Sequence, residues 1–242
     1  MARPYTRALD PTDYADLPHA EPLRAFEAAM TAPHCRWHPH KIWENASILQ
    51  ELDELGVPKD AAILDVGSGG TFFPCYLATV AGYPDVTLTD SMANKDITAD
   101  IAAQRAAYGI RLPLHALQAE DMAALPSASW DVVLCISTIE HVDADQHDAA
   151  LREICRLTKP GGVICLTSDY FRHDAEGHVD AAQFAASPYK DGQATPYRQP
   201  FVEHLPNVID ADFVGGTDLA YRGDFVHNYS FVNICLRKRS AA

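Results

Sequence analysis

Basic side chains are scarce in this sequence of 242 residues, which has 19 lysines and arginines against 33 aspartates and glutamates, a formal net charge of −14. Such an acidic surface repels phosphate backbones and anionic lipids, which argues against a nucleic-acid or membrane partner. No apolar run approaches the roughly 18 residues of a membrane helix. The segment Met1–Asp10 also lacks the apolar stretch of a secretory signal. We therefore expect a cytoplasmic protein with a small-molecule ligand and an oligomeric state that the sequence does not specify.

Paired cysteine motifs are also missing, since none of the six cysteines forms a C-x-x-C pair. Cys135, Cys165 and Cys235 each lie inside an apolar, strand-like run. This placement favours buried free thiols in a reducing compartment over disulfides or a zinc site.

The central part of the chain alternates between apolar runs and segments with helical periodicity. This alternation predicts a doubly wound α/β fold with a mostly parallel sheet of seven strands, including an antiparallel strand at the C-terminal edge. The predicted strands are 61–66, 86–89, 112–117, 131–137 and 162–167, and the predicted helices between them are 73–81, 94–108 and 144–158.

The two ends of the chain depart from this alternation. Residues 1–58 are interpreted as an irregular arm followed by helices over 21–31 and 40–55, forming a cap on the substrate side. The predicted core spans 59–242. Within it, residues 170–214 have little periodicity and many aromatics, which predicts a lid-like insertion. Two further strands, 218–221 and 229–237, are expected to pair antiparallel at the sheet edge. The density of aromatic residues suits a lid over an apolar or aromatic acceptor. The candidate acceptor-pocket residues are Trp37, His38, His40, Lys41, Trp43, Tyr170, Phe171, Phe184, Tyr189, Tyr197 and Phe201.

The first predicted strand ends in a glycine turn, Asp65-Val66-Gly67-Ser68-Gly69-Gly70, which then opens a helix. Glycines allow a sharp turn and the close approach of a ligand at the carboxyl end of a parallel sheet. A dinucleotide fingerprint requires a third glycine where this chain has Phe72. Asp65 disfavours a diphosphate and suits an ammonium group. S-adenosylmethionine carries an ammonium group and a sulfonium but no phosphate, so the charge pattern favours it over NAD.

Polar residues follow the next strands in the order that such a cofactor requires. Asp90 ends the second strand, where a carboxylate accepts hydrogen bonds from both ribose hydroxyls. The third strand leads into Glu120-Asp121-Met122, where an aspartate can bond the adenine amino group beside an apolar wall. The fourth strand ends in Ile136-Ser137.

From Ala61 to Ser168 the sequence resembles the class I S-adenosylmethionine-dependent methyltransferases, especially the branch acting on small molecules. The resemblance rests on the glycine turn, the two acidic strand ends and the Pro160-Gly161-Gly162 turn, in the family's order. It implies that Asp65, Gly67 and Gly69 hold the methionine part and Asp90 the ribose. It also implies that Asp121 and Met122 meet the adenine, and that Ile136 and Ser137 lie near the methyl group. We include Ser68, Ser91 and Glu120 in the expected cofactor site.

Methyl transfer is an in-line displacement, so a base is needed only if the acceptor must lose a proton. His141, just beyond the fourth strand, is the catalytic candidate, because imidazole titrates near neutrality. The alternative is that Glu140 and His141 only brace the next helix. A metal at this pair is disfavoured, because Ile136, Ser137 and Thr138 stand where similar quinone-pathway enzymes have further acids.

Two other functions stay open at this point. One is an NAD(P)-dependent oxidoreductase, which the missing third glycine disfavours. The other is a cofactor-binding protein without catalysis, which the sequence separates poorly from an enzyme, because a displacement needs few dedicated side chains. The acceptor and the methylated atom are not specified by the sequence.

Overall fold

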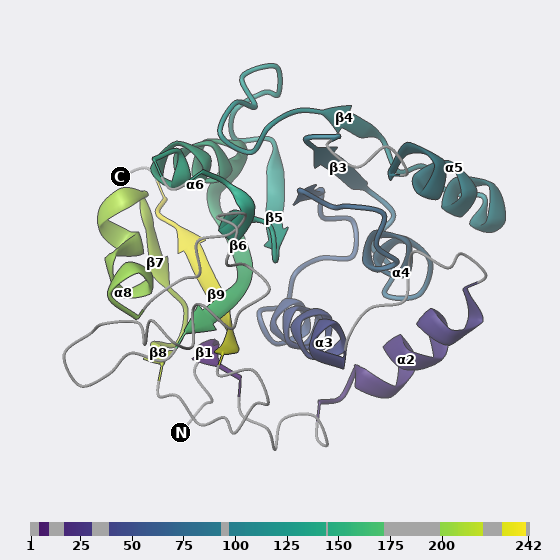
Figure 1. Cartoon of the computed structure of the whole chain (residues 1–242), viewed down its shortest axis with the longest axis horizontal. Helices are drawn as coiled ribbons and strands as arrows, with labels where there is room; N and C mark the ends of the chain where they lie inside the picture. The colour runs from purple at the N-terminus through teal and green to yellow at the C-terminus, as the bar shows by residue number, and fades with distance from the viewer. Residues whose placement is uncertain are drawn as a thin grey trace.

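The structure is a computed structural model that describes residues 5–9, 17–30, 39–92, 97–143, 145–171, 199–219 and 229–240. Its centre is a twisted sheet in the order β4-β3-β2-β5-β6-β9-β1-β8, and β7 also pairs with β9 (Figure 1). The first five strands of this order are mutually parallel, as predicted. They are β4 (Leu114–Ala116), β3 (Val86–Asp90), β2 (Ile63–Val66), β5 (Trp130–Ile136) and β6 (Thr158–Phe171).

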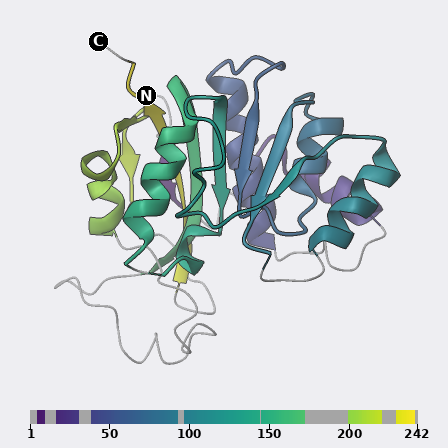
Figure 2. The same ribbon diagram turned by 90° about the horizontal axis from the view of Figure 1, so that it is seen from above.

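Successive residues of the central strands point to opposite faces of the sheet, and an apolar core covers each face. On β2, for example, Ile63 belongs to one core and Leu64 to the other. The first core is completed by α2 (Ala20–Ala29), α3 (Pro39–Glu54), α4 (Phe73–Thr79) and α5 (Ile97–Tyr108). The second core is completed by α6 (His147–Leu157) and α8 (Gln199–Val208), which lie side by side (Figure 2). Helices on both faces confirm the doubly wound fold.

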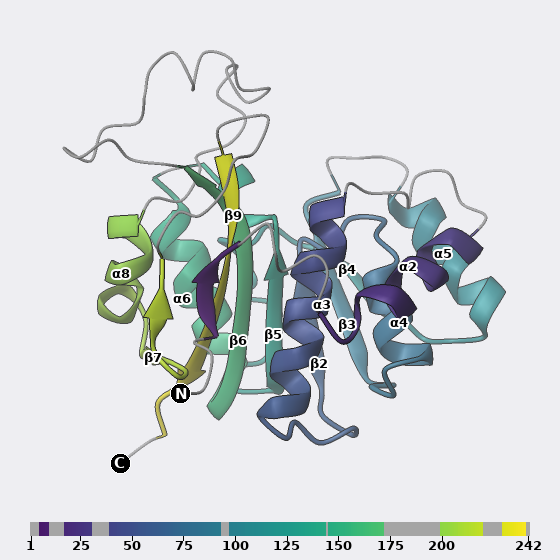
Figure 3. The same cartoon turned by 90° about the horizontal axis from the view of Figure 1, so that it is seen from below.

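The N-terminal segment contains a strand that the sequence analysis missed. Instead of an irregular arm, β1 (Thr6–Ala8) joins the sheet between β9 and β8. It lies beside β9 and near α3 (Figure 3). The Thr6 hydroxyl also accepts a hydrogen bond from the Cys235 amide, 229 residues away. A strand of three residues whose partner is so distant leaves no periodicity to detect. The boundary between residues 58 and 59 stays a prediction.

The C-terminal part also differs from its prediction. β8 (Thr217–Asp218) pairs with β1 rather than with β9 (Tyr229–Lys238). The strand that pairs with the end of β9 is β7 (Ala211–Phe213). The antiparallel run of β9 along β6 is confirmed, but strands lie beyond it, so the sheet has nine strands where seven were expected.

The predicted insertion over 170–214 is only partly described. Its segment 199–213 is not an irregular lid, because it forms α8 and β7, which pack against α6 and β9. Pro200 and Pro206 obscured the helical pattern of α8. The segment 172–198, with Phe184, Tyr189 and Tyr197, lies outside the described residues, as do Trp37 and His38.

The five cysteines that the structure describes, Cys75, Cys135, Cys155, Cys165 and Cys235, are all buried and outside disulfides, as predicted. No helix in the described ranges is long and apolar enough to span a bilayer.

Candidate functional site

A cavity of about 650 Å³ opens at the carboxyl ends of β2, β3 and β5. Because these strands are parallel, the residues that follow each of them meet at one edge of the sheet. Most of the predicted site residues line this cavity: Asp65, Gly67, Ser68, Gly69, Asp90, Ser91, Glu120, Ile136, Ser137 and His141.

The glycine turn takes a conformation that side chains disfavour. Gly67 and Gly69 have positive φ angles of 68° and 55°. A Cβ on Gly67 would lie 2.1 Å from Cγ2 of Thr138, so this position also has no room for one. The Thr138 hydroxyl donates a 2.9 Å hydrogen bond to the Gly67 carbonyl, which ties the turn to the segment after β5. The turn therefore forms a tightly held backbone surface on the cavity wall.

Asp90 fixes the same turn from the neighbouring strand. One of its carboxylate oxygens accepts a 2.9 Å hydrogen bond from the Gly69 amide, and the other accepts a 2.8 Å bond from the Met92 amide. Each carboxylate oxygen has a second lone pair, so Asp90 can still accept bonds from a ligand in the cavity. Its role is thus both to shape the loop and to present negative charge.

Asp65 is a buried carboxyl on the cavity wall, with 2% of its surface exposed. Burial, with a further contribution from the charge of Asp90, raises its pKa to about 8. Its Oδ1 atom is buried and has no hydrogen-bond partner among the described residues. A buried polar atom without a partner is costly, so a cationic or hydrogen-bond-donating ligand here would be stabilising.

The adenine-side prediction is only partly supported by the geometry. Glu120 lines the cavity, but Asp121 and Met122 do not. Asp121 is exposed, in a short turn closed by its bridge to Gln118. The Met122 side chain is in the core, where the Thr89 hydroxyl lies 3.9 Å from its sulfur. The turn directs Glu120 rather than its two successors toward the cavity.

The segment after β5 is connected to α3 by buried polar contacts. Ser137 has a φ of 45°, unusual for a residue with a side chain, and its hydroxyl donates a 2.6 Å bond to Glu44. The second oxygen of Glu44 lies 3.0 Å from Nζ of Lys41, and the Glu44 side chain is fully buried. Helix α3 thereby places Lys41 and Asn45 on the cavity wall.

Two further acids line this end of the cavity. Glu140, in the 3₁₀ turn η2 (Ile139–His141), is 1% exposed, and Asp169 near the end of β6 is 3% exposed. Burial and the nearby charge of Asp169 raise the pKa of Glu140 to about 8, against the lowering effect of Lys41. The Oε2 atom of Glu140 has no hydrogen-bond partner within the described part of the chain.

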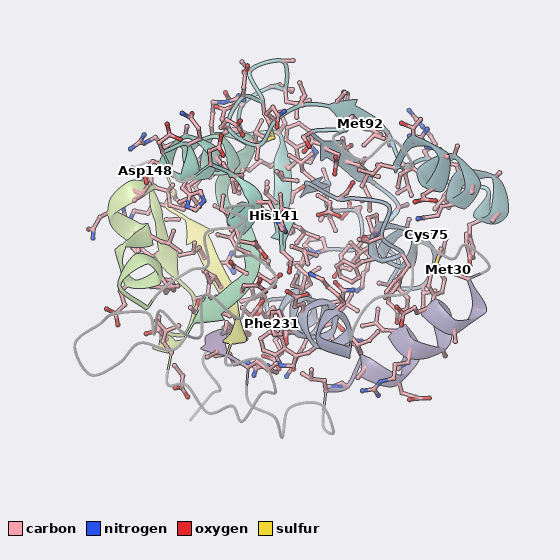
Figure 4. All side chains as sticks on the ribbon, in the orientation of Figure 1. Met30, Cys75, Met92, His141, Asp148 and Phe231 are labelled. Carbon is pink, nitrogen blue, oxygen red and sulfur yellow. The ribbon has the colours of Figure 1, made fainter. Side chains whose placement is uncertain are left out.

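His141 is the exposed member of the same turn. It lines the cavity near the carboxyl end of β5 (Figure 4), and its amide donates a 2.9 Å bond to the Thr138 carbonyl. Of the aromatic and basic candidates on α3, Lys41 lines the cavity, whereas Trp43 is fully buried in the core.

Sequence reasoning missed Asn45, Thr138 and Asp169 as members of the site. Asp169 had a detectable signal, because it comes soon after the predicted strand 162–167, as Asp90 comes directly after the predicted strand 86–89. Asn45 had none, because only the packing of α3 on the sheet brings it to the cavity.

The middle of the chain matches a known protein-family model. Residues 64–166 match the model described as a methyltransferase domain. Over these residues the chain is similar to methyltransferase domains. The match begins within β2 and ends within β6, so it includes the glycine turn, Asp90 and the turn η2.

Two curated relatives, both ubiquinone biosynthesis O-methyltransferases, match about half of this chain. The protein of Xanthomonas axonopodis pv. citri (strain 306) is 30% identical over 111 residues, which cover 46% of this chain and 44% of that protein. The protein of Paraburkholderia xenovorans (strain LB400) is 32% identical over 135 residues, which cover 51% and 55%. The chain thus spans about half the length of the curated relatives it matches.

Solved structures share the fold over most of the domain at low sequence identity. The Burkholderia thailandensis 1,6-didemethyltoxoflavin-N1-methyltransferase, solved with S-adenosylhomocysteine, has a TM-score of 0.59 at 18% identity, covering 96% of this chain and 92% of that one. The [4+2]-cyclase SpnF has a TM-score of 0.63 at 15% identity, covering 82% and 83%. Since one of these similar structures is a cyclase, the fold by itself leaves the reaction open.

Proposed function

We propose that this chain is an S-adenosylmethionine-dependent methyltransferase that acts on a small organic molecule. The observation that carries the proposal is the convergence of Asp65, the glycine turn and Asp90 on one cavity. The methyltransferase domain match and the two O-methyltransferase relatives support the same class of reaction.

The chemistry of the cavity fits this cofactor better than a dinucleotide. Its lining includes six acidic side chains, and Lys41 is the one lysine or arginine among the described residues there. Lys41 is paired with Glu44, so its charge is largely balanced. In the described lining, only Lys41 could offset the charge of a diphosphate, and Glu44 already balances Lys41. A ligand with a sulfonium and an ammonium group is instead attracted to this acidic wall.

Each predicted residue would have a distinct role toward the cofactor. The buried Asp65 carboxyl would accept the ammonium group, and Asp90 would accept the ribose hydroxyls while holding Gly69 in place. We assign Glu120, which lines the cavity, to the adenine side in place of Asp121, which does not. When bound, the cofactor supplies a methyl group activated by the sulfonium. The protein's contribution is then to align the acceptor and exclude water.

We keep His141 as the proposed proton acceptor for substrates that must lose a proton. It is exposed to the cavity, next to the buried Glu140. The bracing alternative predicts a structural effect of replacing His141 and no specific loss of turnover.

Calorimetry with S-adenosylmethionine, S-adenosylhomocysteine and NADH tests the proposal. We expect the first two to bind and NADH not to bind. Asp90→Asn should weaken binding at least about tenfold, equivalent to about 1.4 kcal/mol. The matched control is Asp60→Asn, because Asp60 is exposed and outside the cavity, and it should leave binding unchanged. NADH binding in place of S-adenosylmethionine would overturn the proposal in favour of an oxidoreductase.

Formation of S-adenosylhomocysteine separates catalysis from binding alone. We expect the product, and the gain of one methyl group, when the protein and cofactor are incubated with a metabolite extract and analysed by mass spectrometry. Cofactor binding without methyl transfer to any component of the extract would support a cofactor-dependent protein with another activity, as the cyclase with this fold illustrates.

A further inference from the structure

The cavity extends beyond the residues proposed to hold the cofactor. Asp65 and Asp90 lie at the carboxyl ends of β2 and β3, and Glu120 follows β4. Glu140 follows β5 and Asp169 lies on β6, on the opposite side of β2 in the sheet order. Helix α3 closes this second part with Lys41 and Asn45. We call the part lined by Lys41, Asn45, Glu140 and Asp169 the acceptor end.

Carboxyl groups outnumber cations at the acceptor end. Lys41 lies 3.0 Å from Glu44, whose other oxygen accepts the Ser137 hydroxyl. The positive charge of Lys41 is therefore largely neutralised by Glu44, and little of it is left to neutralise Glu140 and Asp169. Lys41 remains the one lysine or arginine in the described lining.

The environment of Glu140 indicates that a ligand binds at the acceptor end. It is 1% exposed and lines the cavity, and its Oε2 atom lacks a hydrogen-bond partner among the described residues. Because burial and Asp169 raise its pKa to about 8, Glu140 is mostly protonated at neutral pH. A cation placed between Glu140 and Asp169 would offset the cost of burying the Glu140 charge and the repulsion from Asp169, so both carboxyls could ionise.

We infer that the acceptor end binds a methyl acceptor carrying an ammonium group, through Glu140 and Asp169, and discriminates against acceptors carrying a carboxylate or phosphate. The inference rests on the proposed function, because it assumes that the rest of the cavity holds the cofactor. An anionic acceptor would leave Glu140 protonated and would bring a like charge to the buried Asp169 carboxylate, a contact that is strongly unfavourable in a desolvated site.

Matched probes that differ only in charge test the inference. The protein is saturated with S-adenosylhomocysteine and titrated in a calorimeter with 2-phenylethylamine, 2-phenylethanol and 3-phenylpropionate, which share a ring and a two-carbon spacer. We expect the amine to bind at least about tenfold more tightly than the alcohol, and the carboxylate to bind least. Equal affinities, a preference for the carboxylate, or no binding by the amine would overturn the inference.

Charge-neutral variants locate the effect. Glu140→Gln and Asp169→Asn should each remove at least about tenfold of the amine affinity while leaving that of 2-phenylethanol nearly unchanged. Asp145→Asn is the control, because Asp145 is exposed and outside the lining but removes the same charge. If the control lowers amine affinity as much as Asp169→Asn does, only the overall field of the protein is responsible and the inference fails.

Proton release on amine binding distinguishes direct binding by Glu140 from a purely structural role, because a structural role would not change the number of protons released. Among the described residues, the charged and titratable groups around Glu140 are Asp169 on β6, Lys41 and Glu44 on α3, Cys135 on β5 and the adjacent His141 in η2. Amine binding should release up to one proton at pH 7, measured in buffers of different ionisation enthalpy, so affinity should rise from pH 6 to 8. Glu140→Gln should abolish the release, and an unaltered release would contradict the inference.

The two proposals fail in distinguishable ways. If S-adenosylhomocysteine itself does not bind, the proposed function fails. If it binds and the amine shows no preference, only the inference about the acceptor fails.

Discussion

Replacing Gly67 with alanine tests how the glycine turn is held. The residue has a φ of +68°, and its Cβ would lie 2.1 Å from Cγ2 and 2.5 Å from Oγ1 of Thr138. Thr138 cannot simply rotate away without cost, because its hydroxyl bonds both the Gly67 and Ile136 carbonyls. The change therefore combines backbone strain with a steric overlap.

The backbone strain and the steric overlap can be estimated separately and separated by a control variant. A left-handed conformation costs a non-glycine residue about 1–2 kcal/mol, and forcing extra atoms into a packed site costs about 1–3 kcal/mol more. We expect Gly67→Ala to lower the free energy of unfolding by about 2–5 kcal/mol. Gly56 has almost the same φ, +64°, and no atom lies within 4 Å of the position that its Cβ would take, so Gly56→Ala should show the strain alone.

Urea denaturation followed by circular dichroism measures both variants. Adding Thr138→Ala to Gly67→Ala should recover part of the loss, because it removes the two closest atoms, and this gives a positive coupling in a double-mutant cycle. Equal destabilisation by Gly67→Ala and Gly56→Ala would refute the steric argument. S-adenosylhomocysteine affinity should fall only in the variants at Gly67, since Gly56 is outside the cavity.

Three further predictions concern the core, a loop and the turn η2. Burial raises the pKa of Glu51 from 4.5 to about 8, so the stability that its protonated form contributes is complete below about pH 4.5 and is lost as the pH rises through 8. Between these pH values, Glu51→Gln should remove a slope of about 1.4 kcal/mol per pH unit from the free energy of unfolding. An unchanged slope would contradict the raised pKa of Glu51. Arg156 donates hydrogen bonds to the Leu125 and Met122 carbonyls, so Arg156→Met should lower the free energy of unfolding by about 1–3 kcal/mol, measured by thermal or urea denaturation. The control Arg152→Met should lower it by less than about 0.5 kcal/mol, because the ion pair of Arg152 is exposed. His141→Asn should lower kcat about a hundredfold or more with little change in cofactor Kd, measured by S-adenosylhomocysteine formation; equal kcat values would favour the bracing role.

The parallel core was predictable because its signals are local. Each central strand is an apolar run covered on both faces, so β2, β3, β5 and β6 could be recognised without knowing their partners. The glycine turn could also be recognised, because its glycines are adjacent in the sequence. The structure shows why they are needed, since the φ angles of Gly67 and Gly69 are positive and Gly67 lies against Thr138. The short β1 gave no such signal, because its pairing with β9 joins opposite ends of the chain.

The order of the five parallel strands, the glycine turn and the acids at the strand ends could be predicted without a structure, because these features depend on side-chain type and short spacing. Whether Glu120 or Asp121 faces the cavity could not be predicted, since it depends on the conformation of one turn. Only the tertiary structure decided that α3 brings Lys41 and Asn45 to Glu140 and Asp169. Residues that are far apart in the sequence meet there through packing on a common sheet, and no local pattern records such a meeting.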